Sequence, residues 1–415
     1  MTHTTHTFTP KLTFTPKLRP LFIRTCVVQT TIAMLLAASL TSLGTTLTKV
    51  VLPVDSGVAC NDGSPYAYYL YTPSTVEDGV DGAPGSKWVF FQQGGSYCWD
   101  EASCKARATN LMSSKGLSPE LNIASGILSD DPAENPFFAG YNMVELPYCT
   151  SDAFSGTLAQ SSWSTKLSFL GSRVVPSVIA DLKQNHGLVD HASTVVIYSG
   201  ASAGAVGLYP NLDLLSSKLL PASHVVGVID SGWFLDSEPL ETQPCTDQPL
   251  VCSVKENLVR GVAAWNSSVD TDCDSDKGAD EQWQCMMGHY VEPYLTTPIF
   301  VFEWGYDLAQ LYHDGIESNP KASAPALAYA QTSRANLTRT FEAAKRHHHF
   351  FSPACYQHVV LNAKHPTWLH VTAGNVTLAA ALNDFVSGNS SSSVLLDDCT
   401  LPDCNPTCPP PQHIG

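Results

Sequence analysis

The sequence predicts an α/β fold in which helices cover both faces of a mainly parallel central sheet. Five short, continuous apolar runs, which are typical of strands buried on both faces, alternate with stretches of helical periodicity. Such alternation is characteristic of parallel strands joined by helical crossovers. With 415 residues, of which 44% are hydrophobic, the chain is long enough to bury the core of one large domain of this class.

The predicted elements follow one another in a simple order. After a connector that reaches about Leu52, the aromatic-rich stretch 58–73 predicts an early hairpin at the sheet edge. The five buried strands are expected at 87–95, 142–149, 193–200, 224–232 and 297–305, and helices at 173–187, 210–220 and 326–346. The segment from Pro239 to Pro293 has four cysteines and few strand signals, so it is interpreted as a disulfide-bonded insertion that covers one end of the sheet. The terminal segment 387–415 is rich in Ser and Pro, which predicts an irregular tail beyond Cys399, over 400–415.

Residues 1–44 have the composition of a signal peptide. They contain four basic residues and no acidic one, and the apolar run 26–40 is too short to span a bilayer comfortably. Cleavage near Gly44 would give a secreted protein, located outside the cell or in a cell wall. Because the segment before the apolar run is unusually long, an uncleaved membrane anchor is the alternative. Without that anchor, no stable membrane insertion is expected.

Cysteine usage and glycosylation sequons also indicate an oxidising compartment. Of 13 cysteines, only Cys26 lies in the leader, and the 12 that remain are an even number, as expected for a disulfide framework. Their spacing lacks the paired Cys-x-x-Cys and His motifs of common zinc sites, so no metal site is predicted. The Asn-x-Ser/Thr acceptor sequons lie at Asn266, Asn336, Asn375 and Asn389.

The charge balance excludes one class of partner. The chain has 22 Lys and Arg against 38 Asp and Glu, a net charge of −16, and the leader holds four of those basic residues. So acidic a protein is unsuited to binding nucleic acid or anionic membranes. High solubility is the simplest interpretation of this charge.

A Gly-x-Ser-x-Gly sequence at 200–204 centres on Ser202, where a predicted strand gives way to a helix. This is the nucleophile elbow, in which small neighbours allow a strained turn that exposes the serine Oγ. The first amides of the following helix can help to hold an oxyanion. The alternative is an ordinary tight turn of small residues.

A second glycine motif has the position expected of an oxyanion loop. Gly94 and Gly95 end the predicted strand 87–95, upstream of the elbow, where the same arrangement places the loop that supplies the other oxyanion amide. The alternative is a simple turn at the end of a strand.

The remaining members of a catalytic triad would follow in the chain order Ser, acid, His. Asp230 and Asp307 both lie at the ends of predicted strands, and order alone does not separate them. Asp307, after the second strand beyond the elbow, sits where the acid most often lies. The downstream histidines are His289, His313, His347, His348, His349, His358, His365 and His370. The adjacent triplet 347–349 ends a basic helix and is expected to be solvated. His358 is the candidate we favour, because Cys355 could fix its loop.

Longer motifs make the chain resemble a known family. From about Cys60 to Cys399 it contains "CNDGSP", "GILSDDPAENPFF", "NMVELPYCTSDAFSG", "GASAGAVG", "DSGWFLD", "WNSSV", "FEWGYDLAQL" and "SPACYQHV". As a set these resemble the pectin acetylesterase family, and within it most closely the Notum-type branch of palmitoleoyl-protein carboxylesterases. The resemblance implies a single α/β-hydrolase-type catalytic domain over 53–399, with no metal or organic cofactor, that acts as a serine carboxylesterase on O-acyl esters through an acyl-enzyme.

The resemblance also assigns roles to individual residues. It implies Ser202 as nucleophile, Asp307 as orienting acid and His358 as base. For the oxyanion hole it implies Gly95, Ser96 and Ala203, and for the acyl pocket Tyr97, Phe234, Met286 and Met287. The chain departs from the family pattern at two places: Ser96 stands where tryptophan usually follows the paired glycines, and the two methionines replace two phenylalanines. The alternative for the apolar residues is simple core packing.

The same resemblance implies a set of disulfide bonds: Cys60 with Cys149, Cys98 with Cys104, Cys245 with Cys252, Cys273 with Cys285, and Cys355 with Cys399. Cys404 and Cys408 are then left as a pair in the tail. The Cys355 bridge would fix the loop that carries His358.

Two kinds of substrate follow from the resemblance: an O-acetylated polysaccharide, or a protein that bears a longer acyl chain. The alternative function is that of a catalytically silent secreted binding protein on the same fold.

Overall fold

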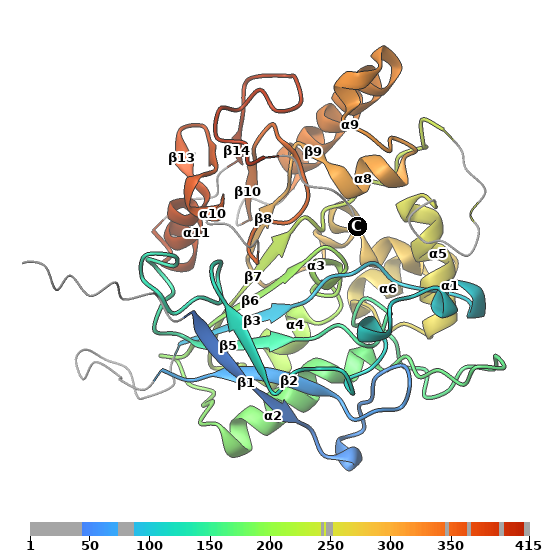
Figure 1. Ribbon diagram of the computed structural model, residues 1–415, viewed down its shortest axis with the longest axis vertical. Helices are drawn as coiled ribbons and strands as arrows, with labels where there is room; N and C mark the ends of the chain where they lie inside the picture. Colours follow the sequence, from blue (N-terminus) through green and yellow to red (C-terminus); the bar gives the residue numbers. More distant parts are fainter. Residues whose placement is uncertain are drawn as a thin grey trace, which may run out of the picture. The chain divides into compact units, whose positions relative to one another are not determined.

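Ten strands form one mainly parallel sheet in the computed structural model, which describes residues 44–73, 87–241, 245, 252–344, 348–362, 367–389 and 394–410 (Figure 1). The strand order is β14-β10-β8-β7-β6-β3-β5-β2-β1-β4. Strands β14 to β5 in this order pair in parallel, whereas β2, β1 and β4 add antiparallel pairs at one side. The predicted α/β class with a mainly parallel sheet is confirmed.

The strands of this sheet are β1 (Thr45–Val51), β2 (Ala67–Tyr71), β3 (Lys87–Gln92), β4 (Glu120–Ile123), β5 (Asn142–Leu146), β6 (Val195–Ala201), β7 (His224–Asp230), β8 (Ile299–Phe302), β10 (His349–Ser352) and β14 (Val394–Leu396). Two short pairs lie outside it: β9 (Tyr306–Asp307) with β11 (Tyr356–Gln357), and β12 (Thr372–Ala373) with β13 (Val376–Thr377). The α-helices are α1 (Glu101–Lys105), α2 (Val174–Asn185), α3 (Ala203–Val206), α4 (Leu212–Leu214), α5 (Val254–Trp265), α6 (Thr271–Lys277), α7 (Gly288–Val291), α8 (Leu308–His313), α9 (Ala324–Ala343), α10 (Thr367–His370) and α11 (Leu378–Val386).

The five strands predicted from apolar runs are β3, β5, β6, β7 and β8, and they form the centre of the sheet. Two expectations about its antiparallel side were wrong. The predicted connector before Leu52 contains β1, whose Thr- and Val-rich sequence suits a pleated, half-buried strand. The hairpin expected at the edge instead supplies β2, which lies between β5 and β1, so that the edges of the sheet are β4 and β14.

Both faces of the central strands are buried, as their continuous apolar sequences predict. In β3, Trp88 and Phe90 belong to one hydrophobic cluster and Val89 and Phe91 to another, because successive side chains point to opposite faces. The first cluster includes residues of α2, α3, α5 and α9, and the second includes residues of α10 and α11. Helices therefore pack on both faces of the sheet.

The segment 239–293 supplies α5, α6 and α7, together with the disulfides Cys245–Cys252 and Cys273–Cys285. It packs against the loop that follows β3, since the indole Nε1 of Trp265 donates to the carbonyl of Cys98 at 2.7 Å. That loop begins at the carboxyl end of a parallel strand, where sites of open α/β sheets form. The insertion therefore contributes to the end of the sheet that carries the candidate site.

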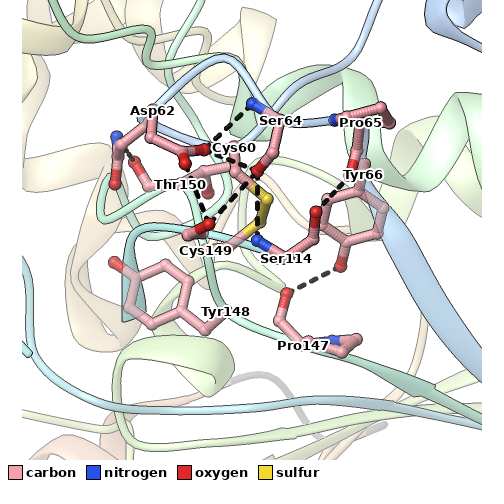
Figure 2. The surroundings of a disulfide bond; sticks show 12 residues. Cys60, Asp62, Ser64, Pro65, Tyr66, Ser114, Pro147, Tyr148, Cys149 and Thr150 are labelled. Atoms are coloured by element: carbon pink, nitrogen blue, oxygen red, sulfur yellow. Dashed lines mark hydrogen bonds between the residues drawn. A yellow bond between two sulfur atoms is a disulfide. The ribbon is translucent and has the colours of Figure 1, made fainter. Parts of the chain in front are cut away.

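Figure 2 shows the Cys60–Cys149 bridge, which joins the loop before β2 to the residues that follow β5. Around it, the hydroxyl of Tyr66 donates to the carbonyl of Pro147 at 2.8 Å, and Ser64 donates to Asp62 through both its amide and its hydroxyl. The bridge thus fixes the chain immediately after Tyr148. The Cys98–Cys104 bridge is also present as predicted.

Two disulfide predictions were wrong. Cys355 pairs with Cys408, and Cys399 pairs with Cys404, in place of Cys355–Cys399 and Cys404–Cys408. The reason is the path of the tail: after β14 a turn, in which the amide of Cys404 donates to the carbonyl of Leu401, brings Cys404 back to Cys399. The chain then continues to Cys408, beside the loop of Cys355.

The predicted catalytic domain, 53–399, lies within a larger compact unit of the structure. One compact unit spans residues 44–415, so β1 and the disulfide-linked tail belong to it together with residues 53–399. The tail has no regular secondary structure over the described residues 400–410, and 411–415 lie outside the described residues. The leader predicted over 1–44 also lies, apart from Gly44, outside them. Within the described residues, no helix has the length and apolar composition needed to cross a membrane.

Candidate active site

Ser202 occupies a sharp turn between β6, which ends at Ala201, and α3, which begins at Ala203. Its backbone has φ 55° and ψ −125°, a conformation that costs free energy for a residue with a side chain. The turn is held by two hydrogen bonds: the Ser202 amide donates to the carbonyl of Asp230 at 2.9 Å, and the Ser202 carbonyl accepts from Val206 at 3.0 Å. This is the geometry of a nucleophile elbow.

The two glycines of the motif allow the chain to pack this closely. A Cβ on Gly204 would lie 2.3 Å from the carbonyl oxygen of Gln92, and one on Gly200 would lie 2.7 Å from that of Gly204. Both distances are shorter than any van der Waals contact, and the obstacle in each case is backbone. The helix can therefore begin directly after Ser202 only with glycine at both positions.

Asp307 and His358 are brought together by the short parallel pair of β9 and β11, in which Gln357 lies opposite Asp307. The Nδ1 of His358 donates to Oδ2 of Asp307 at 2.7 Å. The other oxygen of Asp307 accepts the amide of Gln310 at 2.8 Å and so caps α8. Because the carboxylate holds the proton on Nδ1, Nε2 is left free to accept one.

Several charged groups set the protonation of His358. Burial disfavours its charged form, but the hydrogen bond and charge of Asp307, with a smaller effect of Asp230, outweigh burial and raise the pKa of His358 above its ordinary value. His313 also lies near, and burial, more than the His358 charge, lowers the pKa of His313 to about 4. Its Nδ1 is hydrogen-bonded to the carbonyl of Cys252 at 2.8 Å. His313 is therefore neutral at physiological pH.

Asp230, the other acid candidate, binds the backbone of the loop that carries His358. Its buried carboxylate accepts the amides of Val360 and Leu361 at 2.9 and 2.8 Å, and the hydroxyl of Ser231 at 3.0 Å. Burial raises the pKa of Asp230 to about 6, although these hydrogen bonds favour its charged form. Asp230 thus fixes the segment that directly follows His358, whereas Asp307 holds the imidazole ring.

A cavity of about 690 Å³ lies above the elbow. Its lining includes Ser202, His358 and the predicted residues Gly95, Ser96, Tyr97, Ala203 and Phe234. The ring of Phe234 lies 6.3 Å from that of His358, measured between centroids. The structure therefore gathers the predicted nucleophile, base, oxyanion residues and two of the four predicted acyl-pocket residues around one space.

The loop that bears Gly95 and Ser96 is shaped by positive φ angles of 138° and 54° at these two residues. Arg107 holds it: its guanidinium donates to the Ser96 carbonyl at 3.0 Å and to Ser151 Oγ at 2.7 Å, and lies 5.3 Å from the centre of the Tyr148 ring. Because the Ser96 carbonyl accepts a hydrogen bond from Arg107, this oxygen points to the arginine. The amides of this loop remain the natural donors for the cavity.

Met286 and Met287 do not line this cavity. Their side chains are 0% and 1% exposed, and both belong to the core cluster that also contains Trp233. The prediction that they form an acyl-pocket wall was therefore wrong, and the alternative of core packing holds. They lie at the end of a 3-10 helix, Gln282–Met286, which turns them inward.

Sequence reasoning did not assign Arg107, Tyr312, Val359 and Asn362 to the site, and it named His313 only among the downstream histidines. The sequence held one indication of this lining. Ala309, Tyr312 and His313 follow Asp307 at helical spacing, so they share a face of α8.

The histidine triplet was expected to be solvated, and this was wrong for the two residues that the structure describes. His348 is 1% exposed, with Nε2 lying 3.2 Å from Oε1 of Glu292. His349 begins the buried strand β10. His347 and His365 lie outside the described residues. Within the described residues, no group of three or more His, Cys, Asp or Glu side chains is arranged to hold a metal ion.

The sequons differ in exposure. Asn266, Asn375 and Asn389 are exposed, whereas Asn336 is half-buried on α9 and accepts a hydrogen bond from Arg339.

Comparison with known proteins agrees with this architecture. The family model Pectinacetylesterase matches residues 39–409. Palmitoleoyl-protein carboxylesterase notum1 of Xenopus laevis is 34% identical over 375 residues, which are 86% of this chain and 73% of that protein. Palmitoleoyl-protein carboxylesterase NOTUM of Homo sapiens is 32% identical over 381 residues, 87% and 73% of the two chains.

A solved structure gives the same result for the fold. The Wnt deacylase Notum from Drosophila superposes with a TM-score of 0.77 at 30% sequence identity, and the match covers 88% of this chain and all of that one. The α/β-hydrolase-like fold predicted from the sequence is confirmed. The chain belongs to the pectinacetylesterase family and is a carboxylic-ester hydrolase.

Proposed function

We propose that this chain is a secreted serine esterase that hydrolyses O-acyl esters through an acyl-enzyme. The observation that carries the proposal is the joint placement of Ser202 and His358 at one cavity, with His358 hydrogen-bonded to Asp307 at 2.7 Å. In this mechanism Ser202 Oγ attacks the ester carbonyl while Nε2 of His358 takes its proton. His358 then returns the proton to the leaving alcohol, and the acyl group remains on Ser202.

Hydrolysis of the acyl-enzyme reverses these roles. His358 takes a proton from water, the resulting hydroxide attacks the acyl carbonyl, and the proton returns to Ser202 as the acid leaves. Asp307 keeps the ring in the productive tautomer throughout. The oxyanion of each tetrahedral intermediate would accept hydrogen bonds from amides of the Gly95–Ser96 loop and of Ala203. Loss of one such donor typically lowers kcat by about 10²–10³-fold.

For the substrate we propose an acyl chain longer than acetyl, carried by a protein. A cavity of about 690 Å³ lies within the range of roughly 300–1,000 Å³ that encloses drug-sized ligands, so it has room for more than two carbons. The named activity of the relatives, on palmitoleoyl-protein, supports the same choice. An O-acetylated polysaccharide is the second candidate, because the matching family model is that of pectinacetylesterase.

Secretion is supported by the six disulfides of the structure and by the exposed sequons, both of which suit an oxidising compartment. Expression with the native leader, followed by N-terminal sequencing of the protein in the medium, tests both export and cleavage near Gly44. Retention of the full-length chain in the membrane fraction would instead favour the uncleaved anchor.

The central experiment compares wild type with Ser202→Ala on p-nitrophenyl esters of two to sixteen carbons. Wild type should hydrolyse these esters with a preference for chains longer than acetyl, and a serine-directed fluorophosphonate should label it. Ser202→Ala should lose both turnover and labelling while its thermal transition stays nearly unchanged. Turnover by this variant at the wild-type rate would contradict the serine mechanism, and a folded wild type with neither property would favour a binding protein.

A further inference from the structure

Glu303 is a buried carboxyl directly behind the triad. It follows the last residue of β8, lies four positions before Asp307 and is 2% exposed. One oxygen, Oε2, accepts the amide of Trp233 at 2.7 Å, and no N–H or O–H group of the described residues donates to Oε1. Its side chain and that of Asp307 line one small cavity of about 20 Å³, and the charge of Asp307 acts on Glu303.

Two carboxyls can share a hydrogen bond only when one of them carries a proton. Asp307 accepts hydrogen bonds from Gln310 and His358, one at each of its two oxygens. Glu303 accepts only the single amide of Trp233 at Oε2. Burial, and then the charge of Asp307, raise the pKa of Glu303 well above its ordinary value. The environment therefore places the shared proton on Glu303.

Among the described residues, no Lys or Arg side chain forms an ion pair with Glu303 or Asp307. Asp230 adds a further negative charge that disfavours ionised Glu303, and the nearby phenol of Tyr209 is itself neutral, since burial raises its pKa. Arg334 lines the same small cavity, but its guanidinium donates to the carbonyls of Cys399 and Asp397. His358 is faced by Asp307, Asp230 and the neutral His313, as described above.

We propose that Glu303 is a positioning residue of the triad, held as the neutral acid and donating its proton to the Asp307 carboxylate. This bond restrains the Asp307 carboxylate, so that Oδ2 stays aligned with Nδ1 of His358. It also keeps a third negative charge away from the imidazole. The role rests on the proposed function of Ser202, Asp307 and His358, but the state of Glu303 is measurable in resting protein.

Glu303→Gln and Glu303→Leu separate this role from two alternatives: an ionised Glu303, and a Glu303 that does not position the triad. Glutamine keeps a donor toward Asp307 and an acceptor for Trp233, so the acidic limb of the kcat/KM profile should stay at its wild-type pH. Leucine removes the donor, and a loosened triad should lose roughly ten- to a hundredfold in kcat with little change in KM. Glu145→Gln, which alters a carboxyl on β5 outside the cavity lining, is the matched control.

Two further measurements are made on resting protein and do not depend on turnover. Infrared difference spectra of wild type minus Glu303→Gln should contain the carbonyl band of a protonated carboxyl at neutral pH. NMR titration of the His358 ring should give the same midpoint in wild type and in Glu303→Gln. If wild type proves inactive, the proposed function fails, yet these two measurements still decide the state of Glu303.

The proposal is overturned by any of three results. A lower His358 midpoint in Glu303→Gln would mean that Glu303 is ionised in wild type, because its charge stabilised the imidazolium. A carboxylate band in place of the protonated one would mean the same. Wild-type kcat in folded Glu303→Leu would remove the positioning role, and if that variant does not fold, the glutamine measurements decide the question.

Discussion

Breaking the Cys355–Cys408 bridge should affect both stability and catalysis. Cys355 lies three residues before His358, and the bridge closes a sequence separation of 53 residues. In the chain-entropy description, a loop of that length corresponds to about 4 kcal/mol of unfolding free energy. The Cys399–Cys404 bridge, with a separation of 5, corresponds to about 2 kcal/mol. The paired variant Cys355→Ser with Cys408→Ser should therefore lose about twice as much stability as the matched variant of the other bridge.

The catalytic effect follows from what the tail binds. The side-chain amide of Gln357, directly before His358, donates to the carbonyls of Pro409 and Pro410 at 3.0 and 2.9 Å. Releasing Cys408 frees this part of the tail, so the His358 loop loses both its covalent and its hydrogen-bonded support. Ester hydrolysis by folded protein should then fall, whereas the Cys399–Cys404 variant should keep more of its activity.

Urea unfolding gives the stability of both variants, and initial rates well below the transition give their activity. Peptide mapping of wild type under non-reducing conditions should recover a Cys355–Cys408 peptide. Recovery of Cys355 linked to Cys399, or equal losses of stability in the two variants, would refute this account of how the loop is fixed.

Three other changes test separate parts of the site. Because His358 must be neutral to act as base and its pKa is raised above 6.5, hydrolysis should fall as pH decreases through a midpoint above 6.5, and a midpoint below it would contradict the raised pKa. Gly204→Ala places a methyl group 2.3 Å from the carbonyl of Gln92 and should cost about 1–3 kcal/mol in urea unfolding; a neutral effect would show that the elbow has room. Asp230→Asn turns a donor toward the amide of Val360, which should cost about 1–3 kcal/mol and lower kcat; wild-type values of both would show that the loop does not depend on it.

The centre of the fold could be predicted from the sequence, but its margins could not. Strands such as β6 and β7 are buried on both faces, so nearly every residue is apolar and the pattern is unambiguous. β1 alternates buried and exposed residues, and only two residues of β10, Phe350 and Phe351, are apolar, so neither gives a long apolar run. Their positions depend on long-range pairing, which local patterns do not contain.

The same distinction applies to the candidate site. The Ser202 turn could be predicted because a local constraint, close backbone contact at the two glycines, is written in five adjacent residues. The pairing of the last four cysteines could not, since four cysteines allow three pairings and the path of the tail decides between them. Met286 and Met287 illustrate a third case: their apolar character is equally compatible with a pocket wall and with a core, and only the direction of the backbone separates the two.

Asp230 shows why spacing alone left the acid undecided. Its main-chain carbonyl accepts the amide of Ser202, and its carboxylate accepts the amides of Val360 and Leu361, just beyond His358. Asp230 therefore connects the turn of Ser202 to the loop of His358, the first through its main chain and the second through its side chain. Asp307 binds the imidazole of His358, whereas Asp230 binds the backbone on both sides of the cavity, at Ser202 and after His358. Asp230 ends β7 and Asp307 lies shortly after β8, so both are at the carboxyl edge of the sheet, one bound to the backbone of the loop and the other to its imidazole.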